Sequence, residues 1–132
     1  MSKPFDQIHE LFDARAAASP EQTFLHTPGG TVSLGPLRAQ ADSLEAELRA
    51  QGVREGDRVL IVADNCPEHV KLILACSRVG AWSCGVNARM SRGEIAAFIE
   101  KADPRLVYFT SAVSDAAQAH ARSYQASASV LP

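Results

Sequence analysis

Five consecutive apolar residues at 59–63, with the sequence VLIVA, constrain the possible folds of this chain more than any other feature. A strand with one face in water alternates polar and apolar side chains, whereas a strand covered on both faces is apolar throughout. Two further strand patterns follow at 81–86 and 106–109, and helical patterns separate them. The run therefore predicts a parallel sheet that helices cover on both faces.

The helices between these strands carry recognisable start and stop signals. Asn65 with Glu68, and Ser91 with Glu94, have the spacing of a capping box. Gly80 stands where a glycine ends a helix. The first of the two helices is apolar over most of its surface, which predicts burial against more than one neighbour.

From residue 57 onward, the predicted elements alternate as βαβαβαβ. Ser114 opens the last helix, which extends to about residue 124, and 128–131 is predicted as a final strand. Alternation of this kind is typical of parallel sheets with right-handed crossovers. The predicted fold class is α/β, a Rossmann-like parallel sheet with helices on both faces.

The preceding segment, 4–52, is predicted as a helix, a short hairpin and a second helix. The first helix covers 4–18, and the hairpin strands are 23–26 and 31–34 with Pro-Gly-Gly between them. Pro36 suits a first helical position of the second helix. We expect residues 1–132 to form a single partial domain, made of this segment and the unit at 57–132.

The composition excludes several classes of protein. Apolar residues make up 46% and charged residues 21%, which is globular rather than disordered. The net charge of −2 is too balanced for an electrostatic nucleic-acid surface or a polybasic membrane surface. No apolar run reaches the roughly 18 residues that span a bilayer, and no signal peptide is evident, so we expect a cytoplasmic protein.

Ligands of parallel α/β sheets bind beyond the carboxyl ends of the strands. Two loops have this position, 64–67 and 87–90. Asn65 and Ser91 begin the helices there, and the alternative to ligand contact is that both only cap those helices. The sequence contains neither G-x-x-x-x-G-K-[ST] nor G-x-G-x-x-G, so no phosphate-binding motif is assigned.

Cysteine and tryptophan residues offer weaker candidates. Cys66, at a helix start, could have a lowered thiol pKa, although no histidine and acid can be assigned to it. Cys76 and Cys84 are interpreted as small core residues. Trp82 is interpreted as a packing residue in its strand, or alternatively as a substrate-binding residue that lines a ligand pocket.

An ordered set of short motifs resembles a known family. The segments, in chain order, are GVREGDRV at 52–59, NCPE at 65–68, RVGA at 78–81, VNAR at 86–89 and EI at 94–95. Together they resemble the N-terminal region of AMP-forming acyl-CoA synthetases, members of the adenylate-forming ligase superfamily. Gly85 and Ala88 depart from the family pattern, which usually has proline at the first of these places and often at the second.

The resemblance implies an incomplete part of the large N-terminal domain of an acyl-CoA-synthetase-like fold. The family activates a carboxylic acid with ATP and magnesium to an acyl-adenylate, and then forms a thioester with CoA. The family's phosphate loop with its lysine, ribose-binding acid, magnesium-associated glutamate and catalytic lysine have no counterpart in the sequence. We therefore assign this chain no catalytic residue, metal ligand or cofactor of its own, and predict that it is inactive alone.

One residue is a candidate contact under this resemblance. Arg89 matches the arginine of the family's x-N-x-R turn and could contact a CoA phosphate, the alternative being a solvated arginine or a local ion pair. The expected partners are the remainder of a ligase chain, or a partner covering an exposed sheet, and a small carboxylate. Two other functions stay open: a stand-alone flavodoxin-like binding module, and an interaction subunit with a self-complementary apolar surface.

Overall fold

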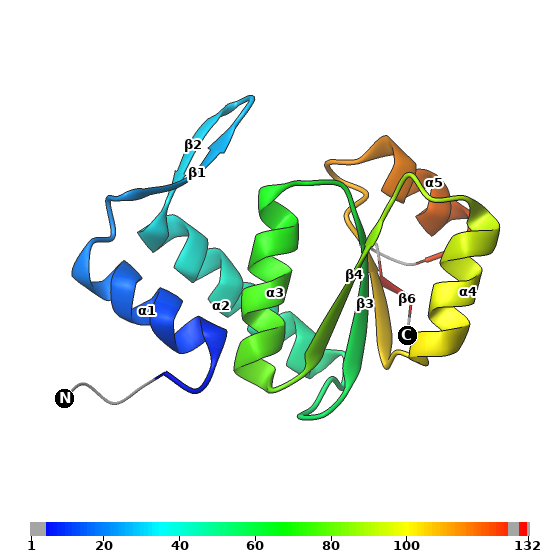
Figure 1. Cartoon of the computed structure of the whole chain (residues 1–132), viewed down its shortest axis with the longest axis horizontal. Coiled ribbons are helices and arrows are strands. Elements are labelled where there is room, and N and C mark those ends of the chain that lie inside the picture. The colour runs from blue at the N-terminus through cyan, green and yellow to red at the C-terminus, as the bar shows by residue number, and fades with distance from the viewer. Residues whose placement is uncertain (1–4, 127–129, 132) are drawn as a thin grey trace.

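The computed structural model describes residues 5–126 and 130–131. Its elements, coloured along the chain in Figure 1, are α1 (Ile8–Ala18), β1 (Thr23–Thr27), β2 (Gly30–Ser33), α2 (Leu34–Ala50), β3 (Arg58–Ala63), α3 (Pro67–Val79), β4 (Trp82–Asn87), α4 (Arg92–Ala102), β5 (Leu106–Phe109), α5 (Asp115–Ser123) and β6 (Val130–Leu131).

The main sheet has four strands in the order β4-β3-β5-β6. The predicted apolar run forms β3, which pairs in parallel with both β4 and β5, so that Ile61 lies between Gly85 and Tyr108. The prediction of a parallel last strand is wrong, because β6 runs antiparallel to β5. Alternating patterns set the order of the elements, but not the direction in which a two-residue strand enters the sheet. The remainder of that predicted strand, 128–129, lies outside the described residues.

Helices cover both faces of the sheet, as the apolar run predicts. Val59, Ile61 and Ala63 pack against α2 and α3 on one face, whereas Leu60 and Val62 pack against α4 and α5 on the other. Figure 1 shows α3 and α4 on opposite sides of the strands. β3 is thus buried on both faces, which explains why its side chains do not alternate in polarity.

Helix α3 is buried on two sides. Leu72, Ala75 and Cys76 face the sheet, while Leu74 packs into a second layer with α1 and α2. The helix ends at Gly80 in the left-handed conformation, with φ of 80°, which a glycine adopts without strain.

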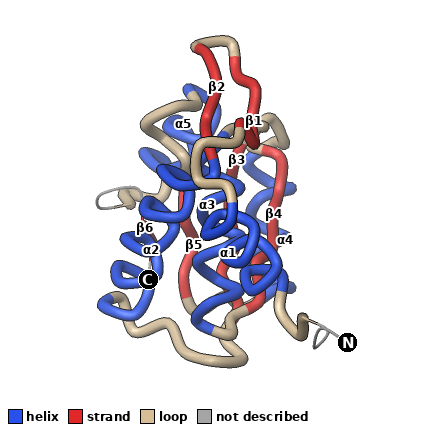
Figure 2. Tube along the Cα trace, turned by 90° about the vertical axis from the view of Figure 1, so that its left-hand side faces the viewer, coloured by secondary structure: helices blue, strands red, loops and turns tan. Residues whose placement is uncertain are grey.

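The N-terminal elements form a layer outside α3. α1 and α2 pack against α3 through the buried side chains of Phe12, Leu37, Ala41 and Leu74, and the antiparallel hairpin β1–β2 extends beyond them (Figure 2).

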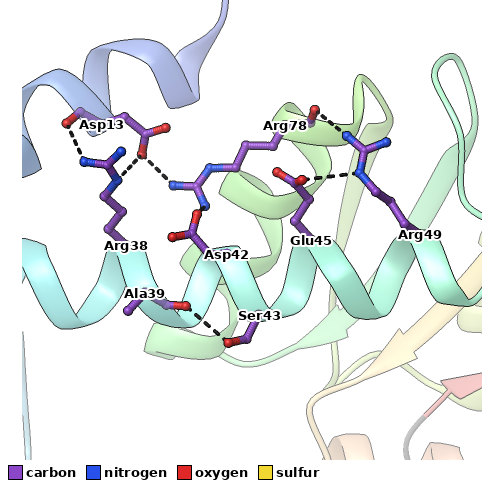
Figure 3. Close-up of polar contacts among 8 residues, drawn as sticks. All are labelled: Asp13, Arg38, Ala39, Asp42, Ser43, Glu45, Arg49 and Arg78. Atoms are coloured by element: carbon purple, nitrogen blue, oxygen red, sulfur yellow. Dashed lines mark hydrogen bonds and ion pairs between the residues drawn. The ribbon is translucent and has the colours of Figure 1, made fainter.

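A buried arginine joins the three helices of this layer (Figure 3). The Arg78 side chain, 5% exposed, forms ion pairs with Asp13 of α1, at 2.5 Å, and with Asp42 of α2. Asp13 also pairs with Arg38 of α2 at 3.5 Å. Within α2, Glu45 and Arg49 form a further ion pair at 3.3 Å. The layer therefore combines a small apolar core with a charged network.

Three helix starts differ from the prediction. α1 begins at Ile8 with Gln7 as its N-cap, whereas the predicted helix covers 4–18. α3 begins at Pro67 and its N-cap is Cys66, not Asn65, because a proline pushes the residue before it into extended geometry. α2 begins at Leu34, so Pro36 is its third residue rather than its first. The missing N–H of Pro36 is tolerated there, because the first four N–H groups of a helix lack intrahelical acceptors.

Candidate functional site

The carboxyl ends of β3 and β4 enclose a cavity of about 470 Å³. The two loops predicted to lie near a ligand both contribute to it. Its lining includes Asp64, Asn65, His69, Gly85, Asn87 and Arg89. The cavity is mostly polar, in contrast to the apolar strands beneath it.

Asp64 connects the loops that follow three neighbouring strands. Its Oδ1 accepts a hydrogen bond from Nε of Arg89, after β4, at 3.2 Å. Its Oδ2 accepts one from Oγ of Ser114, after β5, at 2.6 Å. Both carboxylate oxygens are therefore engaged, and the charge of Asp64 is balanced by that of Arg89.

Arg89 lies at the mouth of the cavity. Its backbone N–H donates to Oδ1 of Asn87 at 2.9 Å, which fixes the turn after β4. The side chain is 80% exposed, and only its Nε has a partner among the described residues. Arg89 therefore forms the local ion pair that was the alternative to a CoA contact. Its two terminal nitrogens are still available as donors.

His69 extends from α3 toward β4. A Cβ at position 85 would lie 2.7 Å from Nε2 of His69, so the glycine there makes room for the imidazole. Partial burial lowers the pKa of His69, and the ring is therefore neutral at pH 7. A neutral imidazole can both donate and accept, which adds a polar group to the cavity.

Two residues of the α5 region support the loops, and sequence reasoning did not place them at the site. The Ser114 hydroxyl caps α5 by accepting from the Ala117 N–H at 3.1 Å while it donates to Asp64. Nε2 of His120 lies 3.0 Å from the carbonyl oxygens of both Ala88 and Met90. The capping pattern identified Ser114 as a helix start, but only the strand order brings α5 beside these loops.

The lowered thiol pKa considered for Cys66 is wrong. Burial raises the pKa of the Cys66 thiol, and this outweighs the hydrogen bond from the His69 backbone. The pKa of Cys76 is raised to about 12 by burial. Cys76 is buried as predicted, and Cys84 is half-buried.

Trp82 is not brought to this cavity. It is the first residue of β4, at the strand end opposite to Asn87, and its side chain is 70% exposed. The interpretation of Trp82 as a packing residue is therefore wrong. Its substrate contact stays a prediction.

Within residues 5–126 and 130–131, no group of three histidine, cysteine or acidic side chains could hold a metal ion. In the same part of the chain, no helix has the length and apolar character needed to cross a membrane.

Comparison with known proteins gives a consistent result. The family described as AMP-binding enzyme matches residues 12–131. A medium/long-chain-fatty-acid–[acyl-carrier-protein] ligase of Mycobacterium tuberculosis is 36% identical over 76% of this chain and 19% of its own length. A 3-hydroxybenzoate–CoA/4-hydroxybenzoate–CoA ligase of Thauera aromatica is 33% identical over 67% of this chain and 17% of its own.

Solved structures share the fold. The N-terminal domain of FACL13 from Mycobacterium tuberculosis has a TM-score of 0.81 at 21% identity, and the match covers 94% of this chain and 31% of that one. VinN with L-aspartate has a TM-score of 0.78 at 25% identity, with 89% and 32% covered. The chain spans about a fifth of the length of the two ligases.

Proposed function

Because this chain belongs to the AMP-binding enzyme family, we propose that it is part of an AMP-forming acyl-CoA synthetase. Such an enzyme joins a carboxylic acid to AMP with release of pyrophosphate, and then transfers the acyl group to the thiol of CoA. The family match across 12–131, which runs from the first helix to the last strand, is the observation that supports this proposal.

The residues of this chain do not form a site for ATP and magnesium. The described residues hold no cluster of three potential metal ligands, and the sequence has no glycine-rich phosphate loop with a lysine. Charge neutralisation by magnesium and lysine is what adenylate formation requires. We therefore assign no step of adenylation to this chain and propose that it does not form acyl-adenylate alone.

A CoA phosphate fits the carboxyl-edge cavity better. The only carboxylate in its lining, Asp64, already accepts from Arg89 and Ser114. No hydrogen bond or ion pair joins Nη1 or Nη2 of Arg89 to another of the described residues. Free guanidinium donors beside a satisfied carboxylate favour an acceptor-rich ligand, and a phosphate accepts two such bonds at once.

The remaining partners follow from the same proposal. The rest of a ligase would supply the ATP site, and a small carboxylic acid would be the substrate. A cytoplasmic location agrees with the three free cysteines, which are usual where thiols are kept reduced. No strand of the described residues pairs with the outer edge of β4, which favours part of a larger enzyme over a self-contained flavodoxin-like module.

Carboxylate-dependent exchange of labelled pyrophosphate into ATP tests this proposal. The purified 132-residue chain is assayed with a panel of fatty and aromatic acids, with a complete ligase of the family as the positive control. We expect exchange by the control and none by this chain. Exchange by this chain that depends on a particular acid would contradict the assignment of adenylation to other residues.

A further inference from the structure

The turn after β4, which carries Arg89, uses its own backbone N–H groups to fix its shape. The Met90 N–H donates to the carbonyl oxygen of Asn87 at 3.1 Å, and the Arg89 N–H donates to Oδ1 of Asn87 at 2.9 Å. The Ala88 N–H donates to the carbonyl oxygen of Ala63, at the end of β3, at 3.0 Å. These bonds use the donors of the turn and leave the carbonyl oxygens of Ala88 and Met90 to be satisfied from elsewhere.

One side chain reaches both of these carbonyl groups. Nε2 of His120, in the last turn of α5, lies 3.0 Å from the carbonyl oxygen of Ala88 and 3.0 Å from that of Met90. A carbonyl oxygen only accepts hydrogen bonds, so Nε2 must carry a proton, which the two oxygens share. The geometry therefore determines which ring nitrogen of His120 donates. Figure 1 shows α5 beside the loop that leads from β4 to α4.

The His120 side chain has no other evident task in the structure. Ala117 and Ala121 of the same helix are buried in the apolar cluster that holds α5 against the sheet. His120 is not among the residues that line the carboxyl-edge cavity, so a ligand there would not touch its ring. Its polar contacts go to the turn that carries Arg89.

A second contact from α5 reaches the side chain of Arg89. Oγ of Ser114 accepts from the Ala117 N–H, and its own proton is donated to Oδ2 of Asp64. Oδ1 of Asp64 accepts from Nε of Arg89. α5 therefore contacts this arginine twice, at the backbone through His120 and at the guanidinium through Asp64.

We propose that His120 is a positioning residue, which holds the turn after β4 so that the Arg89 guanidinium stays at the mouth of the cavity. The proposal rests on the proposed contact between Arg89 and a CoA phosphate. Without their shared donor, the carbonyl groups of Ala88 and Met90 turn toward water, and the backbone of Arg89 between them moves. The guanidinium then leaves the phosphate for part of the time, which lowers the affinity for CoA.

Two substitutions separate the donor from the volume of the ring. His120→Gln keeps an Nε2 that is as many bonds from the backbone and carries two N–H donors, whereas His120→Leu has no donor. His26→Leu makes the same change at an exposed histidine of β1 and is the matched control. In NMR titrations with CoA, we expect His120→Leu to lose at least about fivefold in affinity. His120→Gln and His26→Leu should lose less than about twofold.

A double-mutant cycle shows whether His120 acts through Arg89. In an Arg89→Gln background, His120→Leu should change the affinity for CoA by less than about twofold, because the group that His120 positions is gone. A general loss of structure would instead lower the affinity in both backgrounds, and circular dichroism of each variant verifies that it is folded.

The ring of His120 gives a readout that needs no ligand. Long-range proton–nitrogen spectra of the isotopically labelled chain should show a proton on Nε2 of His120. A proton on Nδ1 alone would overturn the proposal, as would equal affinity of His120→Leu and the unchanged chain or an equal loss in both backgrounds of the cycle.

These results distinguish the positioning role from the function on which it rests. If Arg89→Gln weakens CoA binding and His120→Leu does not, the CoA contact holds and the positioning role is wrong. If the unchanged chain does not bind CoA, the CoA contact is wrong and the positioning role falls with it. The assignment to the ligase family rests on the match over 12–131 and does not depend on either result.

Discussion

The His69 ring lies against Gly85 at the edge of the cavity, in the space that a side chain at position 85 would need. A Cβ at 2.7 Å from Nε2 is closer than atoms can pack without displacement. The glycine at position 85 and the histidine on α3 are therefore coupled in this chain.

This coupling predicts a non-additive pair of substitutions. Gly85→Ala should destabilise the chain by about 1–3 kcal/mol, because the new methyl group forces the His69 ring to move. In a His69→Ala background, the same change should have less than about half that effect, since the clash is gone. Urea unfolding of the four proteins of this cycle measures the coupling, and equal effects in both backgrounds would show that the ring does not lie against Gly85.

The burial of His69 also predicts a pH dependence. Its folded-state pKa is lowered from 6.5, so the unfolded chain binds a proton more readily than the folded chain does. The stability that His69 contributes is present above pH 6.5 and is lost as the pH falls through the folded-state pKa. Urea unfolding at several pH values between about 5 and 8 measures this. As the pH falls, the free energy of unfolding should decrease less for His69→Gln than for the unchanged chain. Parallel curves for the two proteins would contradict this.

At this scale, the strand pattern identified the loops at 64–67 and 87–90, because the position after a strand is readable from the sequence, and the family resemblance singled out Arg89 within them. The supporting contacts were not readable. Ser114 and His120 reach these loops from α5, and their approach depends on which strands are neighbours. Likewise, the raised thiol pKa of Cys66 follows from burial, which a helix-start pattern does not reveal.

At the scale of elements, Arg78 determines how α1 is held. Its guanidinium is buried, pairs with Asp13 of α1, and leaves Nε without a partner among the described residues. A buried charge without its partner is strongly unfavourable, so each side of this pair depends on the other. Asp42 is 62% exposed and contributes less, because water screens it.

Arg78→Met should therefore loosen α1 more than the sheet. We expect a loss of about 2–3 kcal/mol of stability, because Asp13 keeps only its longer ion pair with the exposed Arg38 and Asp42 loses its ion pair with Arg78. Amide hydrogen exchange should accelerate in α1 while β3 stays protected, since the two belong to different apolar clusters. The control is Arg49→Met, which removes an exposed ion pair and an exposed hydrogen bond to the Arg78 carbonyl oxygen but leaves the Arg78 guanidinium paired, and should change stability by less than about 1 kcal/mol. Uniform acceleration in both elements would contradict this account.

Most elements were predictable because their signals are local. The capping box of Ser91 and Glu94 forms, with the Glu94 N–H at 3.3 Å from Oγ of Ser91. The prediction of Asn65 as the cap was wrong because Pro67 makes the residue before it, Cys66, the N-cap. The predicted direction of β6 was wrong because a strand of two residues carries no signal for its direction.

At the scale of the whole molecule, the strand order β4-β3-β5-β6 has two consequences. It brings the loops after β3, β4 and β5 together through Asp64, and it leaves β4 at the edge of the sheet. The α/β class was predictable from the apolar run, but the order of strands was not, since non-local pairing has no local pattern. The cluster of polar loops around Asp64 and the position of β4 at the edge of the sheet therefore both follow from the strand order.

We propose that the free Nη donors of Arg89 bind a phosphate of CoA. The most direct measurement is a titration of the isotopically labelled chain with CoA, followed by NMR. We predict shifts of the amide signals of 87–90, with affinity reduced at least about tenfold by Arg89→Gln and by use of 3′-dephospho-CoA. Arg92→Gln, an exposed arginine on α4, is the control and should bind as the unchanged chain does. Equal binding by Arg89→Gln, or shifts confined to other parts of the chain, would contradict the account.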